Sequence, residues 1–188
     1  SFRKTSMSLL VLECMRKLDE VSEGIVLDEF VKMIDPDLVE VVNLQYSSHL
    51  IELLEDEERM ENFMNIHLCG RGEVDDADDA YFFMPNGRIH PYGFPEDCFK
   101  DKVVTISASA LGRTAFIHPF IEQTGAEIVI APQRDLCPVD AAIWYVNYFY
   151  FLLHHERLAS TAFERTEEHL DNYARGGFQC WYNDHSDE

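Results

Sequence analysis

Apolar residues along the chain follow two alternating patterns. Short runs rich in branched residues predict buried strands at 8–14, 37–47, 65–72, 103–109 and 126–132. Between them, apolar positions every three or four residues predict helices at 26–34, 47–63 and 113–125. Strands that alternate with helices form right-handed crossovers and a mostly parallel sheet. The pattern therefore predicts an α/β domain, a three-layer sandwich of five to six strands with helices on both faces.

Three further segments complete this prediction. Pro85-Asn86-Gly87 is a turn signal within 80–94, which indicates a small hairpin on the rim of the sheet. A short helical turn is expected at 95–101. Residues 139–155 are apolar nearly all round, yet too short and polar for a membrane span, so they predict a buried helix. An amphipathic helix is expected at 160–174.

The length of 188 residues is that of one domain with a full core. We expect this domain to span 7–173, after a leader or tag remnant at 1–6 and before a tail at 174–188. The five cysteines are an odd number without C-x-x-C spacing, which favours reduced thiols. With no signal peptide or membrane span in the pattern, a cytoplasmic location is expected.

The formal net charge of -20 narrows the class of partner. Such a charge repels phosphate backbones and anionic lipids, which argues against nucleic acid and membrane partners. A protein or a basic peptide is the expected partner, and the oligomeric state is left open. An acidic mimic or inhibitor that acts through its charge is an alternative. No cofactor and no metal are expected.

Polar residues stand where the predicted strands break. In a parallel sheet, ligands and catalytic groups gather beyond the carboxyl ends of the strands. Arg71 and Ser109 follow two such ends, and Glu13 ends the first strand. We therefore expect a cleft at this edge, lined by residues from the strand ends, the acidic loop and the hairpin: Glu13, Cys69, Gly70, Gly72, Asp75, Asp76, His90 and Ser107.

The segments Cys69-Gly70-Arg71-Gly72 and Ser107-Ala108-Ser109-Ala110-Leu111-Gly112 resemble a known pair of motifs. In the caspase-like (caspase-hemoglobinase) fold, and in its bacterial CHAT-type branch, one strand runs into Gly-His-Gly with the catalytic histidine. The next core strand runs into Ser-Ala-Cys-x-x-Gly with the catalytic cysteine. The resemblance covers most of Leu9 to Phe163 and implies a caspase-like sheet.

Both catalytic positions of the family are substituted. Arg71 stands in place of the histidine and Ser109 in place of the cysteine. A guanidinium stays protonated and cannot cycle a proton, and a serine hydroxyl without a base is barely ionised. The resemblance therefore implies a pseudo-peptidase, a non-catalytic binding or regulatory module in a prokaryotic defence or cell-death system. An active hydrolase that uses Ser109, or a natural cysteine replaced by this serine, is the alternative.

Three histidines are candidates for a substitute base. His67 is expected to pack in the core and His118 to face away from Ser109, which leaves His90 on the hairpin. His67, Cys69 and Arg71 alternate along one strand and are expected to share a face. A Cys69 nucleophile, or half a metal site with His67, is conceivable, but two donors alone are weak evidence for zinc.

The acidic loop 73–79 has two interpretations. It is either a solvated rim or the receptor for a basic segment of a partner. Arg71 is also a candidate for an ion pair with Glu13 or Asp75, which would lock the cleft.

Overall fold

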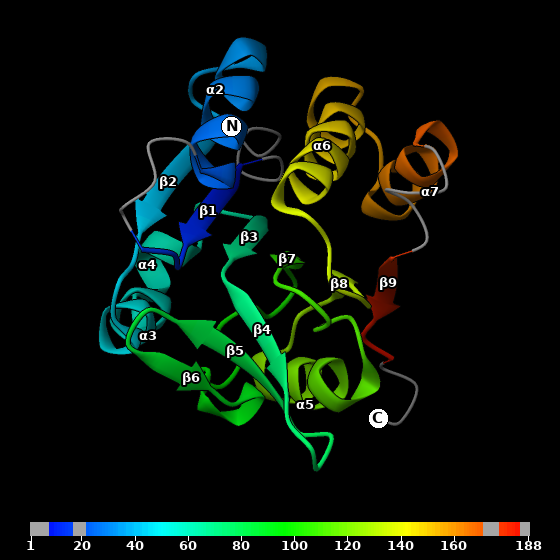
Figure 1. The fold of residues 1–188 in the computed structure, drawn as a ribbon. Helices are drawn as coiled ribbons and strands as arrows, with labels where there is room; N and C mark the ends of the chain where they lie inside the picture. The colour runs from blue at the N-terminus through cyan, green and yellow to red at the C-terminus, as the bar shows by residue number, and fades with distance from the viewer. Residues whose placement is uncertain (1–7, 17–21, 171–176, 185–188) are drawn as a thin grey trace.

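A six-stranded sheet runs through the middle of the molecule in the order β2-β1-β3-β7-β8-β9 (Figure 1). The structure is a computed structural model that describes residues 8–16, 22–170 and 177–184. The strands are β1 (Leu9–Glu13), β2 (Val39–Asn43), β3 (Asn65–Cys69), β7 (Val103–Ser107), β8 (Ile128–Pro132) and β9 (Phe178–Tyr182). The first five are parallel, and β9 pairs antiparallel with β8. The predicted mostly parallel α/β sheet is confirmed.

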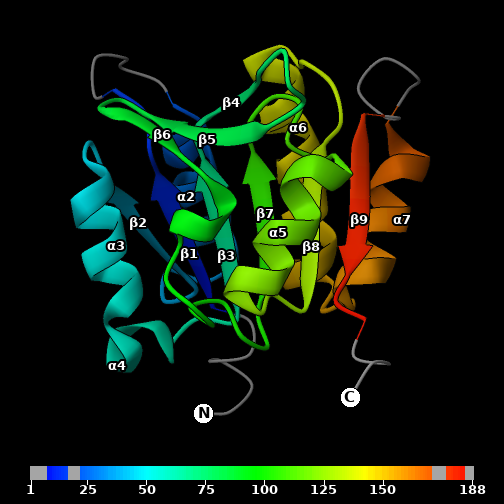
Figure 2. The ribbon, with the colours of Figure 1, turned by 90° about the horizontal axis from the view of Figure 1, so that it is seen from below.

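Helices cover both faces of this sheet (Figure 2). One face carries α2 (Glu23–Ile34), α6 (Pro138–Phe149) and α7 (Ala159–His169); the other carries α3 (Ser47–Glu55), α4 (Glu57–Met60) and α5 (Thr114–Thr124). Successive side chains of β1 point to opposite faces of the sheet. Leu9 and Val11 pack with α2 and α6, whereas Leu10 and Leu12 pack with α3 and α5. The three-layer sandwich is as predicted.

The face of α2 and α6 holds an aromatic core. Trp144 of α6 stacks on Phe178 of β9 with ring centroids 4.0 Å apart, and both are buried. α6 is apolar nearly all round because it packs against the sheet, α2 and α7, and it continues into the π-helical turn η2 (Tyr150–His154). The predicted buried helix is confirmed. None of the helices in the described part of the chain is long and apolar enough to be a membrane span.

A second, antiparallel sheet crosses the carboxyl ends of the parallel strands (Figure 2). It consists of β4 (Arg71–Val74), β5 (Ala80–Met84) and β6 (Gly87–Ile89), followed by the 3₁₀ turn η1 (Pro91–Gly93). The predicted rim hairpin is confirmed as β5 and β6. β4 was not expected, and it forms because the chain leaves the main sheet at Gly70 and pairs Arg71 with Phe83.

Several expected boundaries differ from the structure. Residues 178–182, expected in the tail, form β9 at the edge of the sheet. The helix expected at 47–63 is divided at Asp56, whose side chain caps α4 by accepting a hydrogen bond from the Arg59 N–H. Residues 95–101 form turns and no helix. The leader expected at 1–6 lies outside the described residues.

Candidate functional site at the carboxyl edge of the sheet

The two strand breaks singled out by the sequence lie in contact. β3 and β7 are neighbours, with Cys69 opposite Ser107, and the Gly70 N–H donates to the Ser107 carbonyl over 3.1 Å. A Cβ atom on Gly72 would lie only 2.0 Å from the Ser109 carbonyl oxygen. Only glycine permits this approach of two backbones. The structure thus brings the two motif segments together, as their positions at the ends of neighbouring strands require.

Arg71 is exposed and lies on the second sheet. It lines a cavity of about 290 Å³ together with residues that follow β1 and residues at the end of β5 and in the turn after it: Cys14, Met15, Arg16, Phe83, Met84 and Pro85. The expectation that Arg71 shares a strand face with His67 and Cys69 is wrong, because the chain turns into β4 at Gly70. The expected ion pair with Glu13 or Asp75 is also absent among the described residues.

Ser109 is half-buried and precedes Ala110, whose φ of 62° is left-handed. Such backbone is uncommon for alanine and marks a sharp turn. Within the described ranges, no histidine forms a hydrogen bond with Ser109. His118 is exposed with its ring centroid 5.8 Å from that of Trp181. His90 caps η1, because its Nδ1 accepts from the Tyr92 N–H over 3.2 Å, and its ring stacks on Tyr92.

The acidic loop is organised by its own first aspartate. Asp75 Oδ1 accepts hydrogen bonds from the N–H groups of Ala77 and Asp79 over 2.9 and 3.0 Å. Asp76 is exposed in the same turn. This turn joins β4 to β5 at the end of β4 that is remote from β3. Asp75 and Asp76 are therefore part of a separate acidic tip and do not meet the strand ends.

A buried polar cluster lies on the face of the sheet that α2 covers. Two registered rows cross β1, β3 and β7: Val11, His67 and Thr105 form one, and Glu13, Cys69 and Ser107 form the next. Glu23, the first residue of α2, lies over both rows. The ligating atoms of Glu23, His67 and Cys69 all lie within 4.8 Å of one another.

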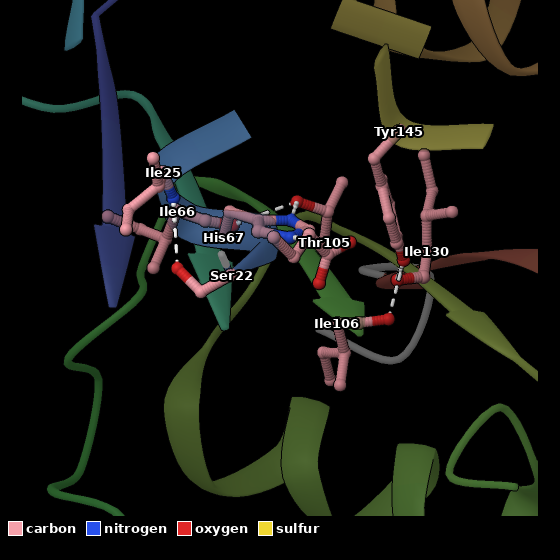
Figure 3. Close-up of polar contacts among 9 residues, drawn as sticks. Ser22, Ile25, Ile66, His67, Thr105, Ile106, Ile130 and Tyr145 are labelled. Carbon is pink, nitrogen blue, oxygen red and sulfur yellow. Dashed lines mark hydrogen bonds and ion pairs between the residues drawn. The ribbon is translucent and has the colours of Figure 1, made fainter. Parts of the chain in front are cut away.

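His67 is held in one orientation at the centre of this cluster. Its Nδ1 lies 2.6 Å from Thr105 Oγ1, which itself lies 3.3 Å from the Ile66 carbonyl (Figure 3). We assign the single Thr105 hydroxyl proton to that carbonyl, which makes Nδ1 the donor to Thr105. The ring also packs edge-on against Tyr145, at 4.4 Å between centroids, and is fully buried. The expectation of a core histidine is confirmed.

The surroundings set the charges of the cluster. Burial raises the pKa of Glu23, but the adjacent imidazole of His67, followed by the Ser107 hydroxyl and the Cys69 thiol, outweighs burial and lowers that pKa. Burial first, and then the Glu23 charge, raise the pKa of the Cys69 thiol well above its ordinary value. Glu23 is therefore a carboxylate and Cys69 a neutral thiol at neutral pH.

The structure thus divides the residues predicted to line one cleft. Glu13, Cys69 and Ser107 meet in the buried cluster, Gly70 and Gly72 lie at the junction of the two sheets, and the remaining three lie elsewhere: Asp75, Asp76 and His90. Glu23 was missed. The sequence feature that could have found it is its position directly after Ser22, the N-cap of α2. The cap is not part of the site, but it places the Glu23 side chain at the edge of the sheet.

Comparison with models of known protein families gave no match for this chain, and comparison with curated proteins gave none either.

Proposed function

We propose that the protein is a non-catalytic binding or regulatory module built on a caspase-like α/β domain. The observation that carries the proposal is the contact between the segments of Arg71 and Ser109 at the ends of neighbouring parallel strands. These are the two positions that bear the histidine and the cysteine in the family that the chain resembles. The two segments that would carry a dyad are in backbone contact, and neither Arg71 nor Ser109 can supply its acid–base chemistry.

The side chains near the two strand breaks support a non-catalytic role. Arg71 cannot accept a proton, and the three candidate histidines make their contacts with Thr105, Tyr92 and Trp181. A serine hydroxyl needs an adjacent base to attack a carbonyl. We infer that Ser109 has no general base and that the carboxyl edge of the sheet binds a partner.

The partner that we propose is a protein or a basic peptide. The net charge of -20 favours a cationic partner, and the exposed tip of the β4–β5 turn concentrates carboxylates at Asp76, Asp78 and Asp79. Electrostatic attraction of this kind speeds association and falls with ionic strength. We place this activity in the cytoplasm, because all five cysteines are unpaired.

A peptide-library assay tests the absence of catalysis. We expect no hydrolysis by the protein and none that depends on Ser109 when it is compared with Ser109→Ala. Turnover that disappears in Ser109→Ala would overturn the proposal in favour of a serine hydrolase.

The position of the substituted dyad can be tested by restoring its residue types. In Arg71→Ala/Ser109→Cys, the introduced thiol should be alkylated slowly at neutral pH; in Arg71→His/Ser109→Cys it should react faster, because a nearby imidazole stabilises the thiolate. Equal alkylation rates would contradict the resemblance to a dyad.

Binding at the acidic tip is tested by recovery of the cellular partner. Asp76→Asn/Asp78→Asn/Asp79→Asn should lose it, whereas a matched triple change of Glu52, Glu55 and Glu58 to Gln, on exposed positions of α3 and α4, should not. Asp75 is left unchanged because it builds the turn. Equal loss of the partner in both variants would show that binding depends on net charge alone and not on the acidic tip.

A further inference from the structure

The buried cluster of Glu23, His67 and Cys69 contains polar atoms without hydrogen-bond partners. Within the described residues, His67 Nε2, Glu23 Oε1 and Glu13 Oε1 are all buried and unpartnered. A buried polar atom without a partner costs about 1–3 kcal/mol. Three such atoms at one edge of a well-packed sheet indicate that a further group satisfies them.

The geometry between two of these atoms points to a metal ion. His67 Nε2 lies 3.6 Å from Glu23 Oε1, too far for a hydrogen bond. Nitrogen and oxygen ligands each about 2.0 Å from one zinc ion lie roughly 3.3 Å apart at a tetrahedral angle. Cys69 Sγ lies within 4.8 Å of one ligand atom of each of these residues, so small side-chain shifts bring all three to a shared ion.

The orientation of His67 is that of a metal ligand. Because Thr105 Oγ1 is the partner of Nδ1, Nε2 is the ring nitrogen left to bind a metal, and it faces Glu23. Ligating histidines characteristically donate their other N–H to an oxygen that holds the ring in place. Thr105 is therefore a positioning residue for this ligand.

Charge provides an independent argument. Glu13 and Glu23 bring two carboxylates to this edge, and the Glu13 carboxyl carbon would lie 2.9 Å from a Cβ atom on Gly24, next to Glu23. Two buried carboxylates without cations are costly in a protein interior. A divalent ion neutralises this charge and allows Cys69 to bind as a thiolate.

We propose that Glu23, His67 and Cys69 bind one Zn²⁺ ion. The set of one carboxylate oxygen, one imidazole nitrogen and one sulfur is typical of zinc, and it leaves a fourth position for a water molecule. Glu13, adjacent to Cys69 across β1 and β3, is placed to accept a hydrogen bond from that water. The site joins α2 to β3 and is separate from the cavity at Arg71.

Metal analysis of the full chain tests the site directly. Protein purified in the presence of zinc and then freed of excess metal should retain one Zn²⁺ per chain. After removal of zinc with a chelator, added Co²⁺ should produce a thiolate-to-cobalt charge-transfer band. A folded protein that binds neither ion, or a cobalt spectrum without that band, would overturn the proposal.

Variants assign the ligands. Cys69→Ser should lose the charge-transfer band, and Glu23→Gln should weaken zinc binding, whereas Cys137→Ser, at an exposed cysteine outside the cluster, should leave both unchanged. Thr105→Val removes the partner of Nδ1, together with the hydrogen bond to the Ile66 carbonyl, and should weaken binding about 10- to 100-fold. Circular dichroism verifies the fold of each variant. Unchanged affinity in Glu23→Gln and Thr105→Val, or equal loss in Cys137→Ser, would refute the assignment.

Discussion

Substitution of Gly72 by alanine tests the contact between the two strand breaks. The new Cβ atom would lie 2.0 Å from the Ser109 carbonyl oxygen and 2.7 Å from Leu111 Cγ. Cβ atoms in proteins essentially never approach a neighbour closer than 3.0 Å. The nearest atom belongs to the backbone and cannot rotate away, so β4 or the turn after β7 must move by about 1 Å to reach even the shortest separation that Cβ atoms show.

The size of the effect follows from this displacement. Forcing an extra methyl group into a well-packed region costs typically about 1–3 kcal/mol. Leu111 is fully buried, so the second contact is not relieved by exposure to solvent. We therefore expect Gly72→Ala to lower the free energy of unfolding by about 3 kcal/mol, at the upper end of that range.

Urea unfolding followed by circular dichroism measures this difference, provided that the slope of the transition is unchanged. Gly93→Ala is the matched control, because the nearest neighbour of its new Cβ atom would be the Ile89 side chain at 3.1 Å. Its free energy of unfolding should therefore fall by less than about 1 kcal/mol. Equal midpoints for the two variants would show that the backbones of Gly72 and Ser109 are not in close contact, and would remove the observation behind the proposed function.

Three further predictions concern stability and reactivity. Phe178→Ala should cost about 3–5 kcal/mol in thermal or urea unfolding, because the ring stacks on the buried core of α6; a loss below about 1 kcal/mol would contradict a packed β9. Lys102→Met should cost about 1–3 kcal/mol, since the ammonium donates to the Met60 and Phe63 carbonyls at 2.9 and 2.6 Å, and the Phe63 carbonyl would lose this donor; unchanged stability would contradict this. Native alkylation followed by mass spectrometry should label Cys137 first, because it is exposed, and Cys14 and Cys69 last, because burial raises the pKa of both thiols; the reverse order would refute this.

The parallel core was predictable because each of its strands is indicated by the apolar pattern of its own segment. The central strands β1 and β3 are short apolar runs that bury both faces, whereas β2 at the edge of the sheet is half-buried. The end of α5 was also predictable, since Gly125 adopts the left-handed φ of 72° that ends helices. These features follow from the side chains of one segment alone.

The missed elements depend on partners distant in sequence. β4 has only one large apolar residue, Val74, and it becomes a strand by pairing with β5. β9 follows a glycine pair close to the acidic end of the chain, and its strand form depends on its pairing with β8. Glu23 meets His67 only because α2 folds back over β3. Single-sequence patterns do not contain these pairings.

The turn at Gly70 separates two kinds of chemistry along five residues of chain. His67 and Cys69 remain on β3 and face α2, whereas Arg71 passes into β4 and lines the cavity. A change of residue at the exposed edge therefore need not disturb the buried donors. On this basis, Arg71→Ala should leave zinc affinity unchanged, as titration with a competing chelator would measure. A joint loss, in a variant that stays folded, would mean that the cavity and the buried cluster form one site.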